Sequence, residues 1–192
     1  MTIRVRFVFV CLLLAASSVA LAEDLRTFAN SEFQFSFQYP ASWQVHPPRT
    51  PNSRGKVVSP SGSPLAECAV IVKRFPQLSS LSQMEIDQVF ARQPTPAEFR
   101  EGLRQTLNDV TVMTVSVGAL QSRPAQLARV QYSVGTEFGK VYVSGRTVTT
   151  ATPGLSWTLT CGGLGGTFEE AARNYLHWQT AINSLVFSFQ FR

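Results

Sequence analysis

The chain has 192 residues, of which 44% are hydrophobic and 15% charged, and it contains 12 glycines and 11 prolines. This balance excludes a disordered or collagen-like chain and predicts one ordinary hydrophobic core. The formal net charge is +5, but the basic residues are spread along the chain and lack the clustering of a nucleic-acid surface. We therefore expect no nucleic-acid partner.

The first 22 residues have the three parts of a secretory signal peptide. Arg4 and Arg6 precede an apolar run, and the small residues Ala20 and Ala22 stand just before the first acidic residues. The run is shorter than the roughly 20 residues that a membrane-spanning helix needs, and the residues before Cys11 do not fit a lipid-attachment site. We expect cleavage after Ala22 and export to the periplasm or the medium, with no transmembrane anchor in the mature chain.

Removal of residues 1–22 leaves Cys68 and Cys161 as the only cysteines of the mature chain. Two cysteines in an exported protein indicate one disulfide, and both lie in apolar, alternating stretches that are typical of strands. In the chain-entropy model, a bridge across so long a loop adds about 4 to 5 kcal/mol. Two buried free thiols are the alternative, whereas a redox pair would need a Cys-x-x-Cys spacing.

The hydrophobic pattern of the first half predicts strands separated by a long loop. Residues 32–39 alternate between aromatic and polar side chains, as in a half-buried strand. Residues 46–64 are rich in proline and are expected to form a loop with a short strand at 56–58. The strand that carries Cys68 then runs to about Phe75.

Helices and a β meander follow. Helical spacing predicts one helix over 81–91 and a second from Pro96, with Thr95 as its N-cap. Four further β segments, separated by glycine and proline turns, indicate antiparallel strands, at residues 111–117, 126–134, 140–149 and 155–161.

The C-terminal part predicts a long helix and a closing strand. Thr167 and Glu170 have the spacing of a capping box, and an apolar stripe that includes Tyr175 and Ile182 follows. Residues 186–191 are predicted to form the last strand because three phenylalanines alternate there, at positions 187, 189 and 191.

Few residues indicate catalysis or metal binding. His46 and His177 are the only histidines, which excludes a metal site built from several histidines, and the short zinc-hydrolase and serine-hydrolase motifs are missing. The glycine run 162–166 precedes a helix, where backbone amides can bind an anion, but Glu169 and Glu170 stand in the first helical turn. We interpret the run as a flexible connection and expect no catalytic residue, cofactor or metal ligand.

One local basic cluster suggests an interaction loop. Arg49, Arg54 and Lys56 lie with His46 in the proline-rich segment 46–64. Prolines reduce the conformational freedom that a loop loses on binding, and the cations would suit an acidic partner or an anionic envelope polymer. A solvated loop without a partner is the alternative. Replacement of all three cations by serine should leave the thermal midpoint nearly unchanged, because exposed charges contribute little to stability.

Both ends of the mature chain resemble the PsbP-like domain family. Residues 33–43, Phe-Gln-Phe-Ser-Phe-Gln-Tyr-Pro-Ala-Ser-Trp, match the aromatic strand, Tyr-Pro step and tryptophan with which members begin, and residues 183–189 resemble the family's closing strand. The resemblance implies the α/β (α+β) sandwich of PsbP and Mog1, with a central antiparallel sheet and helices on both faces. It implies a single domain over residues 25–192 and protein association without catalysis.

These observations favour an exported, non-enzymatic accessory or protein-binding domain of the cell envelope, with another envelope protein or an anionic envelope polymer as its partner. Two alternatives stay open: a small hydrolase that uses residues of the 46–64 loop, and a carrier of a small ligand. A deep pocket with close polar side chains of shifted pKa would favour an enzyme, whereas a shallow exposed patch would favour a protein partner.

Overall fold

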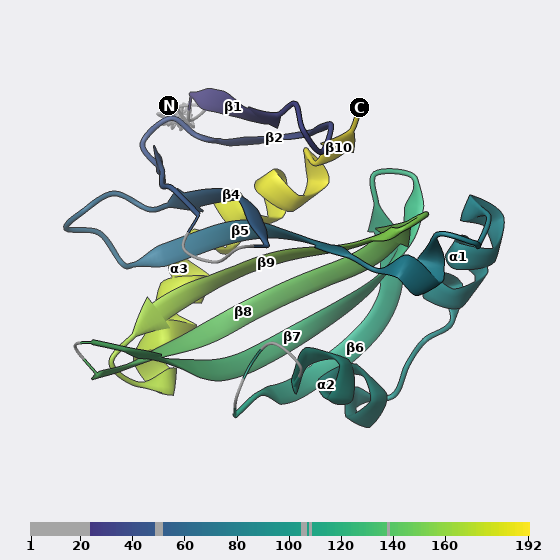
Figure 1. Ribbon diagram of the computed structural model, residues 1–192. Coiled ribbons are helices and arrows are strands. Elements are labelled where there is room, and N and C mark those ends of the chain that lie inside the picture. Colours follow the sequence, from purple (N-terminus) through teal and green to yellow (C-terminus); the bar gives the residue numbers. More distant parts are fainter. Residues whose placement is uncertain (1–23, 49–51, 105–106, 108, 138) are drawn as a thin grey trace, which may run out of the picture.

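A computed structural model describes residues 24–192, apart from 49–51, 105–106, 108 and 138 (Figure 1). The predicted signal peptide, residues 1–22, thus lies outside the described residues. None of the helices in the described part of the chain is both long and apolar enough to cross a membrane.

Two antiparallel sheets and three helices form the fold (Figure 1). The large sheet has seven strands in the spatial order β3 (Gln44–Val45), β4 (Ser53–Val58), β5 (Ala66–Arg74), β9 (Leu155–Gly165), β8 (Gly139–Thr152), β7 (Arg123–Thr136) and β6 (Thr111–Leu120). The small sheet contains β1 (Leu25–Asn30), β2 (Phe35–Pro40) and β10 (Gln190–Phe191). The helices are α1 (Gln83–Ala91), α2 (Pro96–Arg104) and α3 (Phe168–Phe187), with a 3₁₀ turn, η1 (Pro76–Leu78).

Helices cover both faces of the large sheet. α3 packs across β8 and β9, and the small sheet shares the same core. α1 and α2 contact β6, β7 and β8 from the other face (Figure 1). Side chains of β9 alternate accordingly: Leu159 and Cys161 belong to the core under α3, whereas Thr158 and Thr160 line the side of α2. The predicted fold class, an α+β sandwich with an antiparallel sheet, is confirmed.

Aromatic side chains join the two sheets. Phe35 of β2 is fully buried and stacks on Phe189, with ring centroids 5.6 Å apart. The Trp157 ring of β9 meets Phe35 edge to face at 5.9 Å. Such pairs contribute about 0.5–1.5 kcal/mol each beyond the area that they bury. The small sheet is therefore attached to the large one through ring contacts, with no strand shared between them.

The predicted disulfide is present. Cys68 and Cys161 are bonded and occupy directly paired positions on β5 and β9. The sequence separation is 93 residues, yet the two strands are neighbours in the sheet. The alternative interpretation, two buried free thiols, is therefore wrong.

The opening strand differs from its prediction. It begins at Phe35 because residues 31–34 form a turn, in which Gln34 has a φ of 52°. This turn leads back to β1, a strand that the sequence pattern did not predict, and β1 pairs with β2 along its whole length. β2 and β10 pair with each other, as expected for the two ends of the chain, but in the small sheet rather than the large one.

The predicted closing strand at 186–191 is largely wrong. α3 continues to Phe187, whose side chain is 80% exposed, and only Gln190 and Phe191 pair as a strand. The helix continues because Ile182, Leu185 and Val186 are buried at helical spacing. Alternation of phenylalanines cannot distinguish this arrangement from a strand.

The glycine run is not the flexible connection that we expected. β9 continues through Gly165, and Gly163 is buried beneath α3. A Cβ atom at position 163 would lie 2.2 Å from the Tyr175 nitrogen and 2.3 Å from the Ala171 carbonyl oxygen. α3 therefore approaches β9 this closely only because position 163 has no side chain.

Half of the predicted capping box begins α3. The Thr167 hydroxyl accepts a hydrogen bond from the Glu170 backbone N–H at 3.2 Å. The Glu170 carboxylate accepts from the Gly166 N–H at 2.7 Å, instead of from the backbone of Thr167. The carboxylate thus joins the first turn of α3 to the end of β9.

We expect Gly163→Ala to lower the free energy of unfolding by about 1–3 kcal/mol, the usual cost of overpacking, because the obstructing atoms are backbone atoms that cannot rotate away. Chemical denaturation followed by circular dichroism measures this change. Gly135→Ala is the matched control, since a Cβ there meets nothing within 4 Å. Equal denaturation midpoints for the two variants would contradict the close packing of α3.

Candidate functional site

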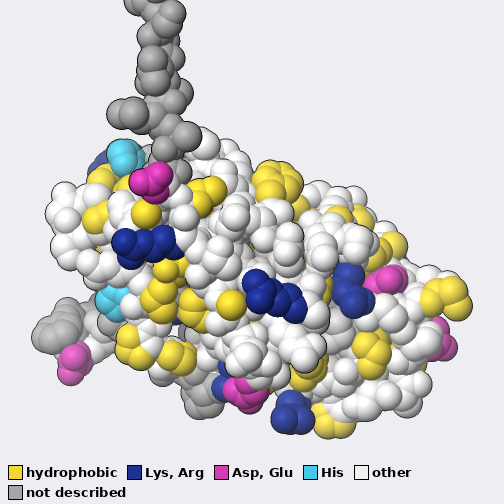
Figure 2. Space-filling view, turned by 90° about the horizontal axis from the view of Figure 1, so that it is seen from above, with side chains coloured by type: hydrophobic (Ala, Val, Ile, Leu, Met, Phe, Trp, Pro, Cys, Tyr) yellow, Lys and Arg dark blue, Asp and Glu magenta, His cyan; other side chains and the backbone are white. Residues whose placement is uncertain are grey.

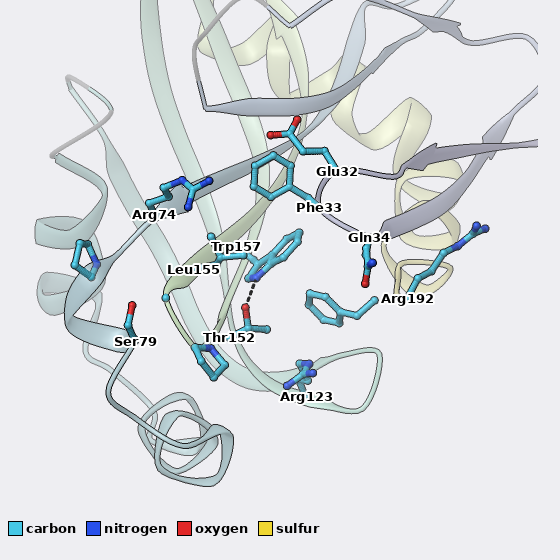
Figure 3. A pocket seen from close by; sticks show the side chains of 14 residues that line it. Glu32, Phe33, Gln34, Arg74, Ser79, Arg123, Thr152, Leu155, Trp157 and Arg192 are labelled. Carbon is cyan, nitrogen blue, oxygen red and sulfur yellow. Dashed lines mark hydrogen bonds between the residues drawn. The ribbon is translucent and has the colours of Figure 1, made fainter.

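A large hollow, which we call the arginine pocket, lies where several turns meet the C-terminal strand (Figure 3). Its volume is about 670 Å³. The walls come from the β1–β2 turn, the end of β5, η1, the start of β7, the β8–β9 turn and β10. Segments that are far apart in the sequence therefore form a single site.

Aromatic rings form the floor of the arginine pocket. Trp157 lies in the middle (Figure 3) and meets Phe191 edge to face at 5.1 Å and Phe33 at 6.4 Å. The Trp157 indole N–H donates a hydrogen bond to the Thr152 hydroxyl at 3.0 Å. Packing and this hydrogen bond together hold the indole in one orientation.

Three arginines surround this floor, whereas Glu32 is the only acidic side chain among the lining residues. Figure 3 shows Arg74, Arg123 and Arg192 on three different sides of Trp157. The Arg123 guanidinium lies 5.0 Å from the centre of the Phe191 ring, and Arg192 Nε donates to the Ser36 hydroxyl at 3.1 Å. Within the described part of the chain, none of the three forms a salt bridge. The charge of Arg74 and Arg123 is available to a ligand in the hollow, whereas the Arg192 guanidinium extends away from it (Figure 3).

Backbone hydrogen bonds hold the turns around the pocket. The Arg192 N–H donates to the Gln34 carbonyl at 2.7 Å, and the Phe75 N–H donates to the Gly154 carbonyl at 2.8 Å. Gly154 has a φ of +76°, and a Cβ there would lie 2.9 Å from the Ser79 hydroxyl. Glycine at this position thus lets the β8–β9 turn pack against the segment after β5.

The arrangement suits an anionic group. Guanidinium groups bind carboxylates and phosphates through two parallel hydrogen bonds, and aromatic faces stack on planar groups. Arg74 and Arg123 can contact an anionic ligand from different sides of Trp157, whereas the Arg192 side chain extends away from the ring (Figure 3). The pocket has the chemistry to bind an anion that carries a flat or apolar part.

The described residues of the predicted interaction loop lie close together, because the His46 N–H donates to the Lys56 carbonyl at 3.0 Å, but they differ in exposure. Arg49 lies outside the described residues, and His46 is half-buried next to β3. Arg54 and Lys56 lie in β4, with the Arg54 guanidinium 4.6 Å from the centre of the Phe33 ring. Lys56 is paired with Glu67 at 2.5 Å, and its side chain is only 11% exposed. The expectation that all three cations are exposed is therefore wrong, while a binding role for the loop stays a prediction.

The sequence did not indicate the arginines of the pocket. Arg74, Arg123 and Arg192 are about 50 to 70 residues apart in the chain. Arg74 ends β5, Arg123 begins β7, and Arg192 directly follows β10. Their position at strand ends was the one sign in the sequence that they could meet at one edge of the fold. Figure 2 shows Lys and Arg side chains in several separate places on one face. Which of the arginines lie near one another therefore depends on which turns the fold brings together.

Solved structures share this architecture. Cyanobacterial PsbP (CyanoP) from Synechocystis sp. PCC 6803 aligns with a TM-score of 0.55 and 12% identity over 94% of this chain and 99% of that one. The Ran-binding protein Mog1p of Saccharomyces cerevisiae aligns with a TM-score of 0.50 and 9% identity, over 88% and 96%. This chain has the PsbP/Mog1-like fold. The resemblance of its two ends to that group is thereby confirmed at the level of the fold.

No protein-family model matches the chain, and no curated protein sequence matches it. At 9–12% identity, the structural likeness concerns the fold alone. The chemistry of the arginine pocket must therefore be argued from this chain's own residues.

The burial of Lys56 changes the expectation for its replacement. Lys56→Ser should lower the free energy of unfolding by about 1–3 kcal/mol, because it leaves the partly buried Glu67 carboxylate without its partner. Urea denaturation of both proteins measures the difference.

Arg173→Ser is the matched control, since Arg173 pairs with Glu169 at 2.6 Å on the exposed surface of α3. Such surface pairs contribute little, and we expect a change below about 0.5 kcal/mol. A Lys56→Ser protein as stable as the control would show that the Lys56–Glu67 pair does not stabilise β4.

Proposed function

We propose that this chain is an exported accessory domain of the cell envelope that binds a partner protein in its arginine pocket and catalyses no reaction. The observation that carries the proposal is the set of three arginines around an aromatic floor with one acidic side chain among them. Mog1p, which has the same fold, is a Ran-binding protein. That precedent supports protein recognition by such a scaffold.

The partner is proposed to present an acidic segment. Carboxylates of Asp or Glu side chains fit guanidinium groups in a bidentate manner, and neighbouring apolar atoms would rest on the half-buried rings of Phe33 and Phe191. The 46–64 loop is proposed to extend this surface, because Arg54 lies over Phe33 and Phe33 lines the pocket. An anionic envelope polymer is the competing ligand that the binding experiment must distinguish.

Export is supported by the signal-peptide pattern of residues 1–22 and by the disulfide, which is typical of oxidising compartments. We expect the protein purified from its native envelope or medium to begin at Glu23. Intact-mass measurement and N-terminal sequencing test this. A chain that retains residues 1–22 or carries two free thiols in its native compartment would contradict export.

Loss of charge in the pocket should weaken capture of the partner. We expect Arg74→Gln with Arg123→Gln to reduce capture from envelope extracts about tenfold or more, because charge-assisted hydrogen bonds contribute about 1.5–3 kcal/mol each. The reduction should shrink as salt is raised, since mobile ions screen exposed charges. Quantitative mass spectrometry of the captured proteins measures it.

Arg100→Gln with Arg104→Gln is the matched control, because it removes the same charge from α2 and from residues that do not line the pocket. Equal capture by both double variants would show that the pocket is not the contact site. Capture that survives protease digestion of the extract would instead indicate a polymer as the ligand, and would overturn the assignment of a protein partner.

A further inference from the structure

A second cavity lies between α2 and the large sheet, on the face opposite α3. Its volume is about 440 Å³, which is within the range of about 300–1,000 Å³ for small-molecule sites. Apolar side chains from the helical segment, including Phe90, Phe99 and Leu103, form one wall. Threonines of β8 and β9 form the opposite wall, and we call this site the threonine cavity.

The threonine wall follows directly from strand register. Thr147 pairs with Thr160, and Thr149 pairs with Thr158, across β8 and β9. Four hydroxyl-bearing side chains thus stand together on one face of the sheet. Thr147 donates to Thr160, with the two oxygens 3.3 Å apart.

One of these hydroxyls is buried without a partner. Among the described residues, no group forms a hydrogen bond with Thr149 Oγ1. A buried polar atom in that state costs about 1–3 kcal/mol. Because less than 1 Å² of this oxygen is accessible, a ligand in the cavity reaches it only when the Thr149 side chain turns, and the hydrogen bond formed then would remove this cost.

Every charged side chain that lines the cavity already has an interaction within the protein. Tyr132 lines it, and burial, with a smaller contribution from the Glu67 charge, raises the pKa of this phenol to about 12. Tyr132 therefore stays uncharged at neutral pH. Three charged side chains line the cavity: Arg92 and Glu98 are exposed and pair with each other at 3.4 Å, and the half-buried Lys73 has an interaction of its own. A charged ligand would lose its hydration inside and would have to break one of these interactions to gain a counter-charge.

Gly102 keeps space open in the helical wall. It lies within α2, and a Cβ atom there would meet nothing within 4 Å. Glycine within a helix is about 0.8–1 kcal/mol less favourable than alanine. Gly102 is exposed and lines the cavity, so a larger side chain there has room to cover or fill the cavity without a backbone clash.

We infer that the threonine cavity binds a small, uncharged, amphipathic molecule. Its apolar body would lie against Phe99 and Leu103, and its polar group would form hydrogen bonds with the threonine wall at Thr149. This site is separate from the arginine pocket and does not depend on the proposed partner protein. Trp157 and Thr158 are adjacent in β9 and line the two different sites.

A matched pair of fluorescent probes tests the inference. N-phenyl-1-naphthylamine is uncharged and carries one N–H donor, and 8-anilinonaphthalene-1-sulfonate has the same aromatic body with a negative charge. Both probes are measured on the Arg74→Gln, Arg123→Gln protein, so that the sulfonate does not bind to the arginine pocket. In this protein we expect saturable binding of the neutral probe, followed by its fluorescence increase, and at least tenfold weaker binding of the sulfonate. Absence of saturable binding of the neutral probe, or equal affinity for both, would overturn the inference.

Two variants locate the binding. Gly102→Leu should fill the cavity and weaken binding of the neutral probe at least tenfold, while its thermal midpoint stays equal to or above that of the parent because leucine favours a helix. Ala97→Leu adds the same side chain at an exposed site on α2 and should bind normally. Thr149→Val, which removes only the hydroxyl, should weaken binding severalfold. Unchanged binding by Gly102→Leu would place the probe elsewhere and refute the site.

Discussion

The contact between α3 and β9 at Gly163 positions most of the molecule. Since no side chain separates the two elements there, the helix lies directly on the sheet, and the buried residues that follow along it continue the core as far as Phe189. The short β10 strand then pairs with β2. The position of α3 therefore determines the position of the small sheet. Together they position Phe191 and Arg192, which form the C-terminal side of the arginine pocket.

The two cavities differ because side chains of a strand alternate between the faces of a sheet. On β9, Trp157 belongs to the aromatic core and the floor of the arginine pocket, whereas Thr158 belongs to the threonine wall. One site therefore combines positive charge with aromatic rings, and the other combines neutral hydroxyls with an apolar helical wall. A single strand supplies residues to both, and the disulfide at Cys161 ties that strand to β5.

Lys56 illustrates how the fold reassigns a residue that seems functional in the sequence. In the sequence Lys56 begins a short predicted strand within a proline-rich loop, and we expected its charge to be exposed. In the structure it lies in a strand next to β5, where Lys56 and Glu67 form a salt bridge. The Lys56 charge is therefore used in an ion pair within the sheet. The positive charge of the arginine pocket comes from arginines 74, 123 and 192. Proximity in sequence is a weak guide to proximity in space when most contacts come from sheet pairing.

The sequence by itself determined the features that depend on local pattern: the four-strand meander, the caps of α2 and α3 at Thr95 and Thr167, and the disulfide, which required only two cysteines in apolar, alternating stretches. Tertiary structure alone decided the end of α3, because burial of Leu185 and Val186 against the sheet outweighed the alternation of phenylalanines around them. It also decided both cavities. Each is built from residues of four or more elements, and their meeting depends on strand order, a property of long-range pairing that no local pattern encodes.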